Sequence, residues 1–383
     1  MAGTSLNIPH VVLIGGGHSH VAVLEGLGRR PLPGARVTLI SRDVKTPYSG
    51  MLPGLIAGHY TRDEAHIDLE PLARVAGVEA VFDEAVGLDL VTRRVHCLAR
   101  PPIGYDVLSI NIGATPNTRV PGSLEHAVPV KPIDRFLGRW DAVCARLHEA
   151  SAPRRVAVVG GGAGGVELLL AVQYRMRTQL AREGRSAAHL EYHLFTAGDT
   201  ILPTHNATVR RVFRRILEQR GVVVHAGRAV TEVLAGRLRT SDGVTHGADE
   251  ILWTTEASAA PWLGEAGLAV DAEGFVRVSS RLQSISHPEV FAAGDVIAMA
   301  GMPLPKSGVF AVRQGPPLGR NLRRAVMGRP LTSYVPQRTF LNLISTGDKY
   351  AVASRGRLAL QGAWVWRMKD WIDRRFVRRF SER

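Results

Sequence analysis

Short apolar runs alternate with longer amphipathic stretches along most of the chain. The run at residues 10–17 (HVVLIGGG) ends in three glycines, and apolar residues at helical spacing follow it at Val21, Leu24 and Leu27. This order predicts a buried strand, a tight turn and the start of a helix. Another β-branched run at 36–41 (RVTLIS) predicts the next strand after that helix. The pattern is typical of an α/β unit with parallel strands.

The same pattern recurs in the middle of the chain. Residues 155–167 (RVAVVGGGAGGVE) repeat the strand, the glycines and the helix start, and 191–196 (EYHLFT) repeats the second strand. Residues 105–113 (YDVLSINIG) also align without gaps on 248–256 (ADEILWTTE). We therefore predict two Rossmann-like halves.

The spacing of the glycines indicates dinucleotide binding. In this fingerprint the first glycine permits the turn, the second lets backbone N–H groups approach a pyrophosphate, and the third lets helix and strand pack closely. Gly15 and Gly17 fit the first two roles, but His20 occupies the third position. In the second half the motif is complete, with Gly160, Gly162 and Gly165, and Glu167 follows on the helix.

A third segment points to a flavin. Residues 288–295 (PEVFAAGD) form a short apolar run that ends in Gly294 and Asp295. The segment resembles the flavin-binding strand of flavoproteins with two dinucleotide-binding domains. That resemblance implies that Asp295 hydrogen-bonds the ribityl and pyrophosphate region of FAD.

Taken in order, VVLIGGG, INIGATPN, VAVVGGGAGGVE and VFAAGDV resemble the pyridine nucleotide-disulfide oxidoreductase superfamily over most of residues 8–330. The segment PKSGVFAVRQGPPLGRN is similar to the type II NADH:quinone oxidoreductase and sulfide:quinone reductase branch. The segments SRDVKTPYSGMLPGLIAGHY, VKPID and GVFAVRQGPPL resemble NADH dehydrogenase-like flavoproteins associated with, or fused to, selenide, water dikinase. These resemblances imply an α/β fold with an FAD domain at 1–120 and 285–330, an NAD(P)H domain at 121–284 and a C-terminal region at 331–383.

The resemblance also implies where the cofactors lie. Residues expected to contact FAD are Gly15, Gly17, His18, Ser41, Arg42, Pro47, Val86, Gly113, Gly294, Asp295, Gly308 and Val309. Those expected to contact NADH or NADPH are Gly160, Gly162, Gly165, Glu167 and Thr196. The family often has an acidic residue at the end of each second strand, where this chain has Ser41 and Thr196, so the choice between NADH and NADPH stays open.

Several polar residues near these motifs allow more than one interpretation. Lys306 and Gln314 flank a helix that we expect to begin at Ser307–Val309, and the resemblance places them on the side of the electron acceptor. A solvated lysine and a capping glutamine are the alternatives. His18 and His20 could act in a proton relay or bind a metal, but beside a phosphate turn we expect packing or cofactor contact, and no metal.

After residue 321 the pattern changes to a linker, a short hairpin and a basic amphipathic segment at 364–383. On a helix one face would carry Trp364, Met368, Trp371, Ile372, Phe376 and Phe380. The segment holds seven arginines or lysines against three acids. Such a helix can dock on the protein body, lie on an anionic membrane surface, or bind a partner protein.

Composition narrows the cellular setting. The formal net charge of the 383-residue chain is +14, but no nucleic-acid recognition module accompanies it, so we expect no nucleic-acid partner. The two cysteines, Cys97 and Cys144, have no dithiol spacing, and the chain starts without a signal-peptide pattern. We expect a cytoplasmic protein, with peripheral attachment to the cytoplasmic face of the inner membrane as the open alternative.

The expected activity follows from the resemblance. Electrons pass from NAD(P)H through FAD to a small acceptor, for which a quinone is the leading candidate. The alternatives are a sulfur or selenium compound linked to selenophosphate synthesis, with selenide, water dikinase as partner, or a flavoprotein that docks on and regulates another enzyme. Since the cofactors carry the chemistry, no catalytic triad is expected.

Overall fold

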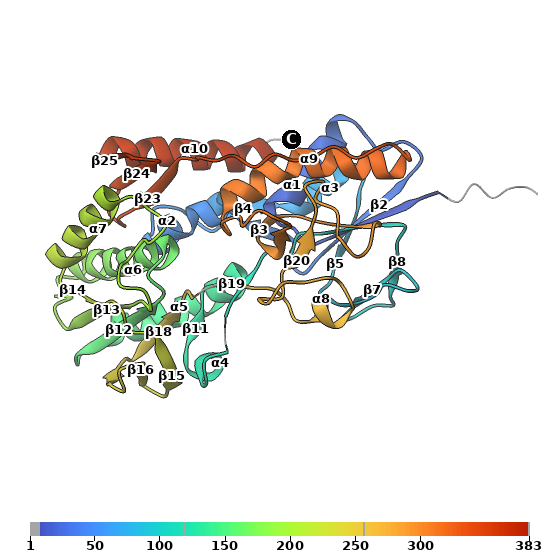
Figure 1. Cartoon of the computed structure of the whole chain (residues 1–383). Coiled ribbons are helices and arrows are strands. Elements are labelled where there is room, and N and C mark those ends of the chain that lie inside the picture. Colours follow the sequence, from blue (N-terminus) through green and yellow to red (C-terminus); the bar gives the residue numbers. More distant parts are fainter. Residues whose placement is uncertain (1–7, 118, 256, 382–383) are drawn as a thin grey trace, which may run out of the picture.

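The computed structural model describes residues 8–117, 119–255 and 257–381. Predictions that involve residues 1–7, residue 118, Glu256 or residues 382–383 lie outside the described residues. Two lobes are joined beneath a long C-terminal helix (Figure 1). Each lobe is built on a parallel sheet, which confirms the predicted α/β class with two dinucleotide-binding folds.

The sheet of the first lobe has the strand order β21-β9-β1-β2-β5, with every neighbouring pair parallel. Its strands are buried because helices pack against it in a shared apolar core. The strands are β1 (His10–Ile14), β2 (Arg36–Ser41), β5 (Glu79–Phe82), β9 (Val107–Ile110) and β21 (Val290–Ala292), and the helices are α1 (His18–Arg29), α3 (Leu69–Val75) and α9 (Gly308–Val326).

The second sheet repeats this arrangement in the order β11-β18-β12-β13-β14, again fully parallel. One face packs on helices, and the other on a small antiparallel sheet of β15, β16 and β17. The elements are β11 (Val128–Pro129), α5 (Ile133–Glu149), β12 (Arg154–Val159), α6 (Ala163–Arg182), β13 (Leu190–Phe195), α7 (Ala207–Gln219), β14 (Val222–His225), β15 (Val230–Leu234), β16 (Arg237–Thr240), β17 (Thr245–Gly247) and β18 (Glu250–Trp253).

Smaller elements connect and cover the two sheets. Around the first sheet lie β3 (Lys45–Pro47), η1 (Ser49–Met51), η2 (Asp63–Ala65), β4 (His66–Asp68), β6 (Ala85–Asp89), β7 (Arg94–Cys97) and β8 (Ile103–Gly104). Helix α2 (Leu52–Ala57) instead packs on α6, in the apolar core of the second lobe. Other short elements lie in the segments where the chain passes between the lobes and re-enters the first lobe. They are β10 (Thr115–Pro116), α4 (Ser123–His126), β19 (Ala257–Ser258), α8 (Trp262–Glu265), β20 (Val276–Val278), η3 (Gly294–Val296) and β22 (Ile297–Met299).

The internal repeat predicted from the sequence is confirmed by the topology. Strand β9 lies beside β1 as β18 lies beside β12, and β2 has the bounds that the pattern predicted. Helix α9 begins at Gly308 with Ser307 as its N-cap, as expected. The chain therefore uses the same layout twice and returns to the first sheet with β21.

The C-terminal region is an antiparallel sheet followed by a helix. Strands β23 (Asn342–Ser345), β24 (Ala351–Arg355) and β25 (Leu358–Gly362) lead into α10 (Ala363–Ser381). Figure 1 shows α10 running from this small sheet across to the first lobe, in red. The hairpin and the helix of the sequence prediction are thus present.

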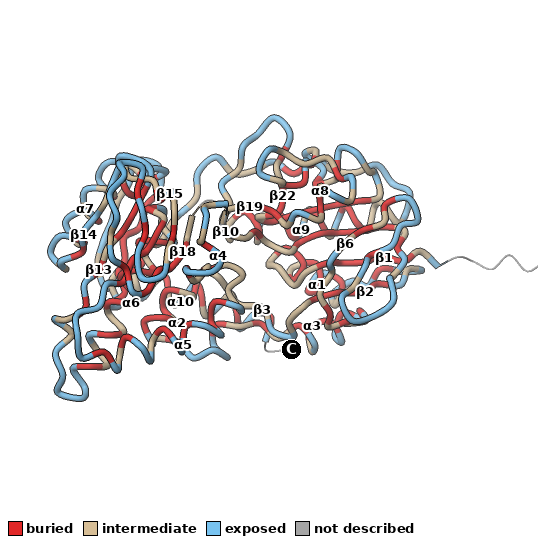
Figure 2. Tube along the Cα trace, turned by 90° about the horizontal axis from the view of Figure 1, so that it is seen from below, coloured by how far each residue is buried: buried red, intermediate tan, exposed pale blue. Residues whose placement is uncertain are grey.

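Buried residues, red in Figure 2, gather along the strands of both lobes. The predicted apolar face of α10 is wrong in part. Phe380 is buried, but Trp364 and Trp371 are 51% and 58% exposed, whereas Lys369 and Asp373 are buried. The polar pair tolerates burial because its charges offset each other at 2.6 Å, and Lys369 also donates to the Gly50 carbonyl at 2.5 Å. Helical periodicity in the sequence could not predict the contact between Lys369 and Gly50, which lie 319 residues apart.

No helix in the described part of the chain combines the length and the apolar character needed to cross a bilayer.

The orientation of α10 can be tested by truncating one side chain from each face. Phe380→Ala should lower the free energy of unfolding by about 3 to 5 kcal/mol, because it empties a packed site. Trp371→Ala should change it by less than about 1 kcal/mol. Chemical denaturation of both variants is the measurement, and a larger loss for Trp371→Ala would contradict this orientation.

Candidate functional site

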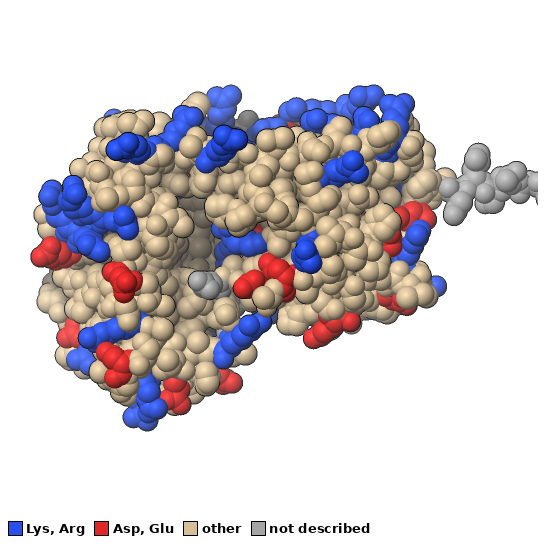
Figure 3. All heavy atoms as spheres, in the orientation of Figure 1, with Lys and Arg blue, Asp and Glu red and all other residues tan. Residues whose placement is uncertain are grey.

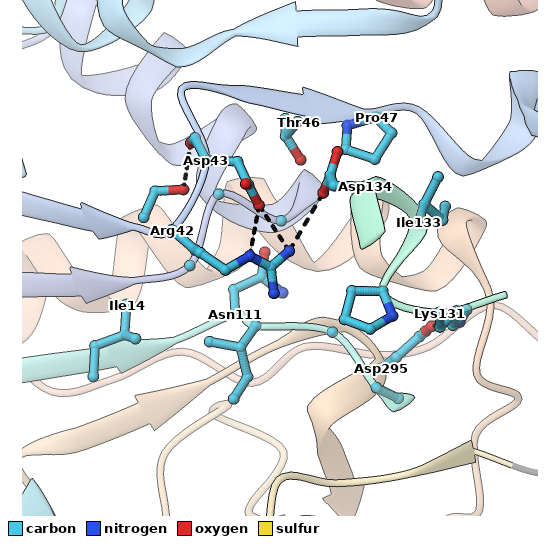
Figure 4. A pocket seen from close by; sticks show the side chains of 18 of the residues that line it. Ile14, Arg42, Asp43, Thr46, Pro47, Asn111, Lys131, Ile133, Asp134 and Asp295 are labelled. Carbon is cyan, nitrogen blue, oxygen red and sulfur yellow. Dashed lines mark hydrogen bonds and ion pairs between the residues drawn. The ribbon is translucent and has the colours of Figure 1, made fainter. Parts of the chain in front are cut away.

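A cavity of about 330 Å³ opens at the carboxyl edge of the first sheet. The β1–α1 turn, the end of β2 and the residues after β9 form one side of it, and Lys131 to Arg135 form the other (Figure 4). Figure 3 shows a hollow between the two lobes on this face of the molecule. Open α/β sheets bind ligands at this edge, where the strand order reverses.

Close contact with Asn111 determines which residues can occupy the first glycine turn. Gly15 has φ +93°, and a Cβ there would stand 2.5 Å from the Asn111 carbonyl oxygen. A Cβ on Gly17 would overlap the side-chain oxygen of Asn111. Both positions therefore need glycine.

Asn111 connects three segments at this turn. Its Oδ1 accepts hydrogen bonds from the backbone N–H groups of Ser19 and His20, at 3.0 and 3.2 Å. Its Nδ2 donates to the Ala293 carbonyl at 2.6 Å, next to the end of β21. The side chain thus supports the N-terminus of α1 and fixes the approach of the Gly294–Asp295 turn.

His20 occupies the position of the missing third glycine and is completely buried. Its Nδ1 donates to the Gly15 carbonyl at 2.7 Å, and its Nε2 accepts from the Ser109 hydroxyl at 2.8 Å. Burial lowers its pKa to about 4, so the ring is neutral at physiological pH. The imidazole therefore bridges strand and helix where a glycine would let them touch.

His18 begins α1 and lines the cavity. Burial lowers its pKa to about 4, and its Nε2 has no hydrogen-bond partner among the described residues. The ring lies edge-on to Tyr48 at a centroid distance of 5.3 Å. A buried polar nitrogen without a partner, beside the N-terminus of a helix, suits a bound group that carries hydrogen-bond acceptors, such as the pyrophosphate and ribityl chain of FAD.

Directly after β2, the guanidinium of Arg42 lies between two carboxylates, those of Asp43 and Asp134. Nε of Arg42 donates to Asp43 at 2.8 Å, and one of its Nη atoms lies 3.5 Å from Asp134 (Figure 4). The Ser41 hydroxyl donates to the Asp43 carbonyl at 2.9 Å, although a ribose could compete for it. These groups can contact the adenosine and phosphate part of a dinucleotide.

Asp295 lies at the opposite side of the cavity, in η3. Its carboxylate pairs with Lys131 at 2.8 Å, and the Gly294 N–H just before it donates to Gln314 at 2.6 Å. Gln314 is therefore buried in α9 as a support for this turn. Pro47, Gly113 and Gly308, which the sequence analysis predicted to contact FAD, also line the cavity.

Five residues predicted to contact FAD or the acceptor are not part of the cavity lining: Val86, Gly294, Val309, Lys306 and Gln314. Val86 is exposed on β6, and Val309 follows the lining residue Gly308 without lining the cavity itself. Lys306 donates from Nζ to the Ile297 carbonyl and lies 3.5 Å from the centre of the Phe275 ring. Burial lowers the pKa of Lys306 to about 8. The acceptor roles of Lys306 and Gln314 stay predictions.

The second glycine turn has the tighter geometry. A Cβ on Gly165 would overlap the Gly160 carbonyl oxygen, so α6 packs directly on the end of β12. Gly160 has φ +129° and faces Thr254. A Cβ on Gly162, the N-cap of α6, would meet no described atom within 4 Å. This open N-terminus can receive a second pyrophosphate.

Glu167 lies one turn further along α6 and is remote from solvent. Its Oε1 accepts from the Ser345 N–H at 2.7 Å. Burial raises the pKa of Glu167 to about 7, and the positive charge of Lys369 opposes that rise. The carboxyl group therefore connects the nucleotide helix with the C-terminal region.

The sequence analysis missed Asn111 and Lys131 as site residues. Asn111 follows a buried strand within INIG, which was a readable signal for a polar position at the carboxyl edge of the sheet. Lys131 had no local signal, because its partner Asp295 is distant in sequence.

Neither a metal cluster nor a cysteine pair contributes to the described site. No group of three or more His, Cys, Asp or Glu in the described ranges could hold a metal ion. Cys97 and Cys144 are both free, and neither lines the cavity.

The geometry matches a known class of protein. Residues 9–315 match the pyridine nucleotide-disulphide oxidoreductase family, and the chain belongs to this family. It is an FAD- and NAD(P)H-dependent oxidoreductase of the type II NADH dehydrogenase-like kind.

Individual relatives agree with this placement. The chain is 26% identical to the NADH dehydrogenase-like protein YutJ of Bacillus subtilis, over 85% of this chain and 86% of that protein. Its fold is similar to the sulfide:quinone oxidoreductase of Aquifex aeolicus, with TM-score 0.80, 19% identity and coverage of 97% and 92%. It is also similar to NDH2 of Plasmodium falciparum in complex with NADH, with TM-score 0.80, 15% identity and coverage of 97% and 98%.

The raised pKa of Glu167 predicts a pH-dependent stability. A carboxyl group that folding makes harder to ionise favours the folded state below its unfolded pKa of 4.5, and that contribution is lost as the pH rises toward about 7. Glu167→Gln should remove this loss. The difference between the melting temperature of Glu167→Gln and that of the wild type should therefore increase from about pH 5 to about pH 8.

A matched control for this comparison is Glu70→Gln, which removes an exposed carboxylate from α3. Its melting temperature should follow the wild type across the same range. A constant difference between Glu167→Gln and the wild type at every pH would contradict the assigned pKa.

Proposed function

We propose that this chain uses NAD(P)H as electron donor and a quinone as electron acceptor. Bound FAD would supply the two-electron transfer between them. Gly15, Gly17, Arg42 and Asp295 would hold FAD in the cavity of the first lobe. Gly160, Gly162 and Gly165 would receive the nicotinamide nucleotide at α6.

One observation carries the choice of acceptor. Tyr48 and Phe376 stack at a centroid distance of 4.5 Å, and both lie against His18 of the cavity lining. A flat aromatic wall beside the cofactor cavity suits a planar ring compound, which can pack on it at little conformational cost. Since Phe376 belongs to α10, the C-terminal helix forms part of the proposed acceptor site.

The cysteines support the same choice. Acceptors that react through persulfide or disulfide chemistry need a thiolate near the cofactor. Burial raises the pKa of both Cys97 and Cys144, and neither lines the cavity. A sulfur or selenium acceptor would find no thiol partner in the described lining.

Reduction of a quinone also consumes protons. Glu167, with its pKa near 7, can exchange a proton close to physiological pH. Lys369 lies near it and is paired with Asp373, while Asp373 hydrogen-bonds Tyr48 and raises the pKa of that hydroxyl further than burial alone. These groups extend from the nucleotide helix to the aromatic wall.

The exposed side of α10 supports contact with a membrane surface. Trp364 and Trp371 lie outside, as does Leu358 of β25, and Arg375 lies 5.1 Å from the centre of the Trp371 ring. Exposed tryptophans among arginines are typical of surfaces that lie at an anionic lipid interface. The outer face of the helix would then meet lipid while its inner face borders the acceptor site.

Anaerobic stopped-flow spectroscopy of the FAD-loaded protein tests this function. NADH or NADPH should bleach the flavin absorbance, and ubiquinone analogues should restore it faster than sulfide or selenium compounds. If neither nucleotide bleaches the flavin, the proposed donor is wrong. If only the chalcogen compounds react, the proposed acceptor is wrong.

A liposome arm of the same experiment separates the two faces of α10. The double variant Trp364→Ser, Trp371→Ser should keep turnover with a short-chain quinone but lose most turnover with a long-chain quinone in anionic vesicles. Phe376→Ala should lower turnover with both. Equal behaviour of the double variant with both quinones would contradict the membrane contact.

A further inference from the structure

The end of β13 lacks the carboxylate that commonly binds the adenosine ribose. Thr196 stands at this point, and a Cβ on Gly161 would lie 2.5 Å from the Thr196 Cβ and Oγ1 atoms. The threonine therefore touches the glycine turn of the second lobe. In Rossmann folds the 2′ position of the adenosine ribose lies at this strand end.

A carboxylate at this position would accept hydrogen bonds from the ribose hydroxyls and would repel a 2′-phosphate. Thr196 carries no charge that would repel a phosphate, and its hydroxyl can donate a hydrogen bond to a phosphate oxygen. Thr196 is also nearly buried, so its side chain has little freedom to leave the turn.

A cation stands beside Thr196 at the same edge of the sheet. The backbone N–H of Arg228 donates to the Thr196 carbonyl at 3.0 Å. The Arg228 side chain is 43% exposed, and its Nε lies 3.2 Å from the Asp242 carboxylate. No partner of its two terminal nitrogens is found among the described residues, so the guanidinium keeps donors for a further anion.

The other charged groups nearby leave room for such an anion. Oδ1 of Asp242 accepts from the Thr240 hydroxyl at 2.6 Å and from the Val244 N–H at 3.2 Å, and its Oδ2 pairs with Nε of Arg228, so this carboxylate engages only one side of the guanidinium. Burial lowers the pKa of His225 to about 4, which leaves that ring uncharged. Asp199 follows in the exposed loop after β13, and Arg214 donates to Thr200 in the same loop at 3.0 Å.

We propose that Thr196 and Arg228 form a binding site for the 2′-phosphate of NADPH, which makes NADPH the preferred electron donor of this chain. The proposal rests on the proposed function only in taking a nicotinamide nucleotide as the donor. Arg228 contributes charge-assisted hydrogen bonds to the phosphate, and Thr196 contributes a hydroxyl without a competing negative charge.

Rapid-reaction measurements on the FAD-loaded full chain test this specificity. The rate of flavin reduction, measured against nucleotide concentration, gives an efficiency for NADPH and for NADH. NADPH should be at least about tenfold more efficient in the wild type, which corresponds to about 1.4 kcal/mol. Arg228→Gln should remove most of this advantage, and Thr196→Glu should reverse the preference.

Arg239→Gln provides the matched control. Arg239 lies on β16 and pairs with Glu232 at 3.2 Å, the same separation as Arg228 and Asp242, with similar exposure. Its removal should leave the ratio of the two efficiencies unchanged. Equal use of both nucleotides by the wild type, or equal ratios in the wild type, Arg228→Gln and Thr196→Glu, would overturn the proposal.

A binding measurement separates this proposal from the proposed function. Calorimetry compares adenosine 2′,5′-bisphosphate with adenosine 5′-monophosphate, two probes that differ in the 2′-phosphate and need no turnover. The bisphosphate should bind the wild type at least about tenfold more tightly, and Arg228→Gln should lose that difference. If the wild type binds both equally, the phosphate site is wrong. If it prefers the bisphosphate but neither NADPH nor NADH reduces the flavin, the donor role fails and the phosphate site stands.

Discussion

The carboxamide of Asn111 holds the cofactor cavity together. It bonds two N–H groups of α1 and the carbonyl of Ala293, and thereby joins segments from the beginning and the end of the first lobe. The backbone of the same residue presses on Gly15 so closely that no side chain fits there. Gly294 and Asp295 follow directly on Ala293, so this side chain helps to position Asp295, the proposed flavin contact, together with Gln314 and Lys131. Three buried hydrogen bonds of one carboxamide thus connect segments of the first lobe that are distant in sequence.

The two halves of the chain solve one packing problem in different ways. In the second lobe Gly165 lets α6 rest on the Gly160 carbonyl, while in the first lobe the imidazole of His20 fills that interval and bonds both sides. A neutral ring with a low pKa keeps the bridge intact through the physiological range. The ends of the second strands differ as well, since Ser41 lies beside a paired arginine and Thr196 beside Arg228, which retains free donors. The repeat determines the architecture of both lobes, and these differences underlie the different ligands that we propose for them.

Local patterns predicted the repeated strands, both glycine turns and the start of α9, because each depends on residues that are neighbours in sequence. They predicted the helix α10 but not its buried face, where the Lys369–Asp373 pair is stabilised by the distant carbonyl of Gly50 and two tryptophans remain exposed. They also could not find the pairing of Lys131 with Asp295, which crosses from one lobe to the other. The sequence thus located the cavity and most of its glycines, but the ion pairs and aromatic contacts that shape it arise only from tertiary packing.

The dependence of the cavity on Asn111 is tested most directly by calorimetric titration of FAD into the apoprotein. Asn111→Ala should raise the dissociation constant for FAD by at least about tenfold, because α1 and the Asp295 turn lose their common support. Asn206→Ala is the matched control, since it removes another asparagine that caps a helix, α7 of the second lobe, through Val209 at 3.0 Å. The control should bind FAD as tightly as the wild type. Equal FAD affinity in Asn111→Ala and the wild type would contradict the central role of this side chain.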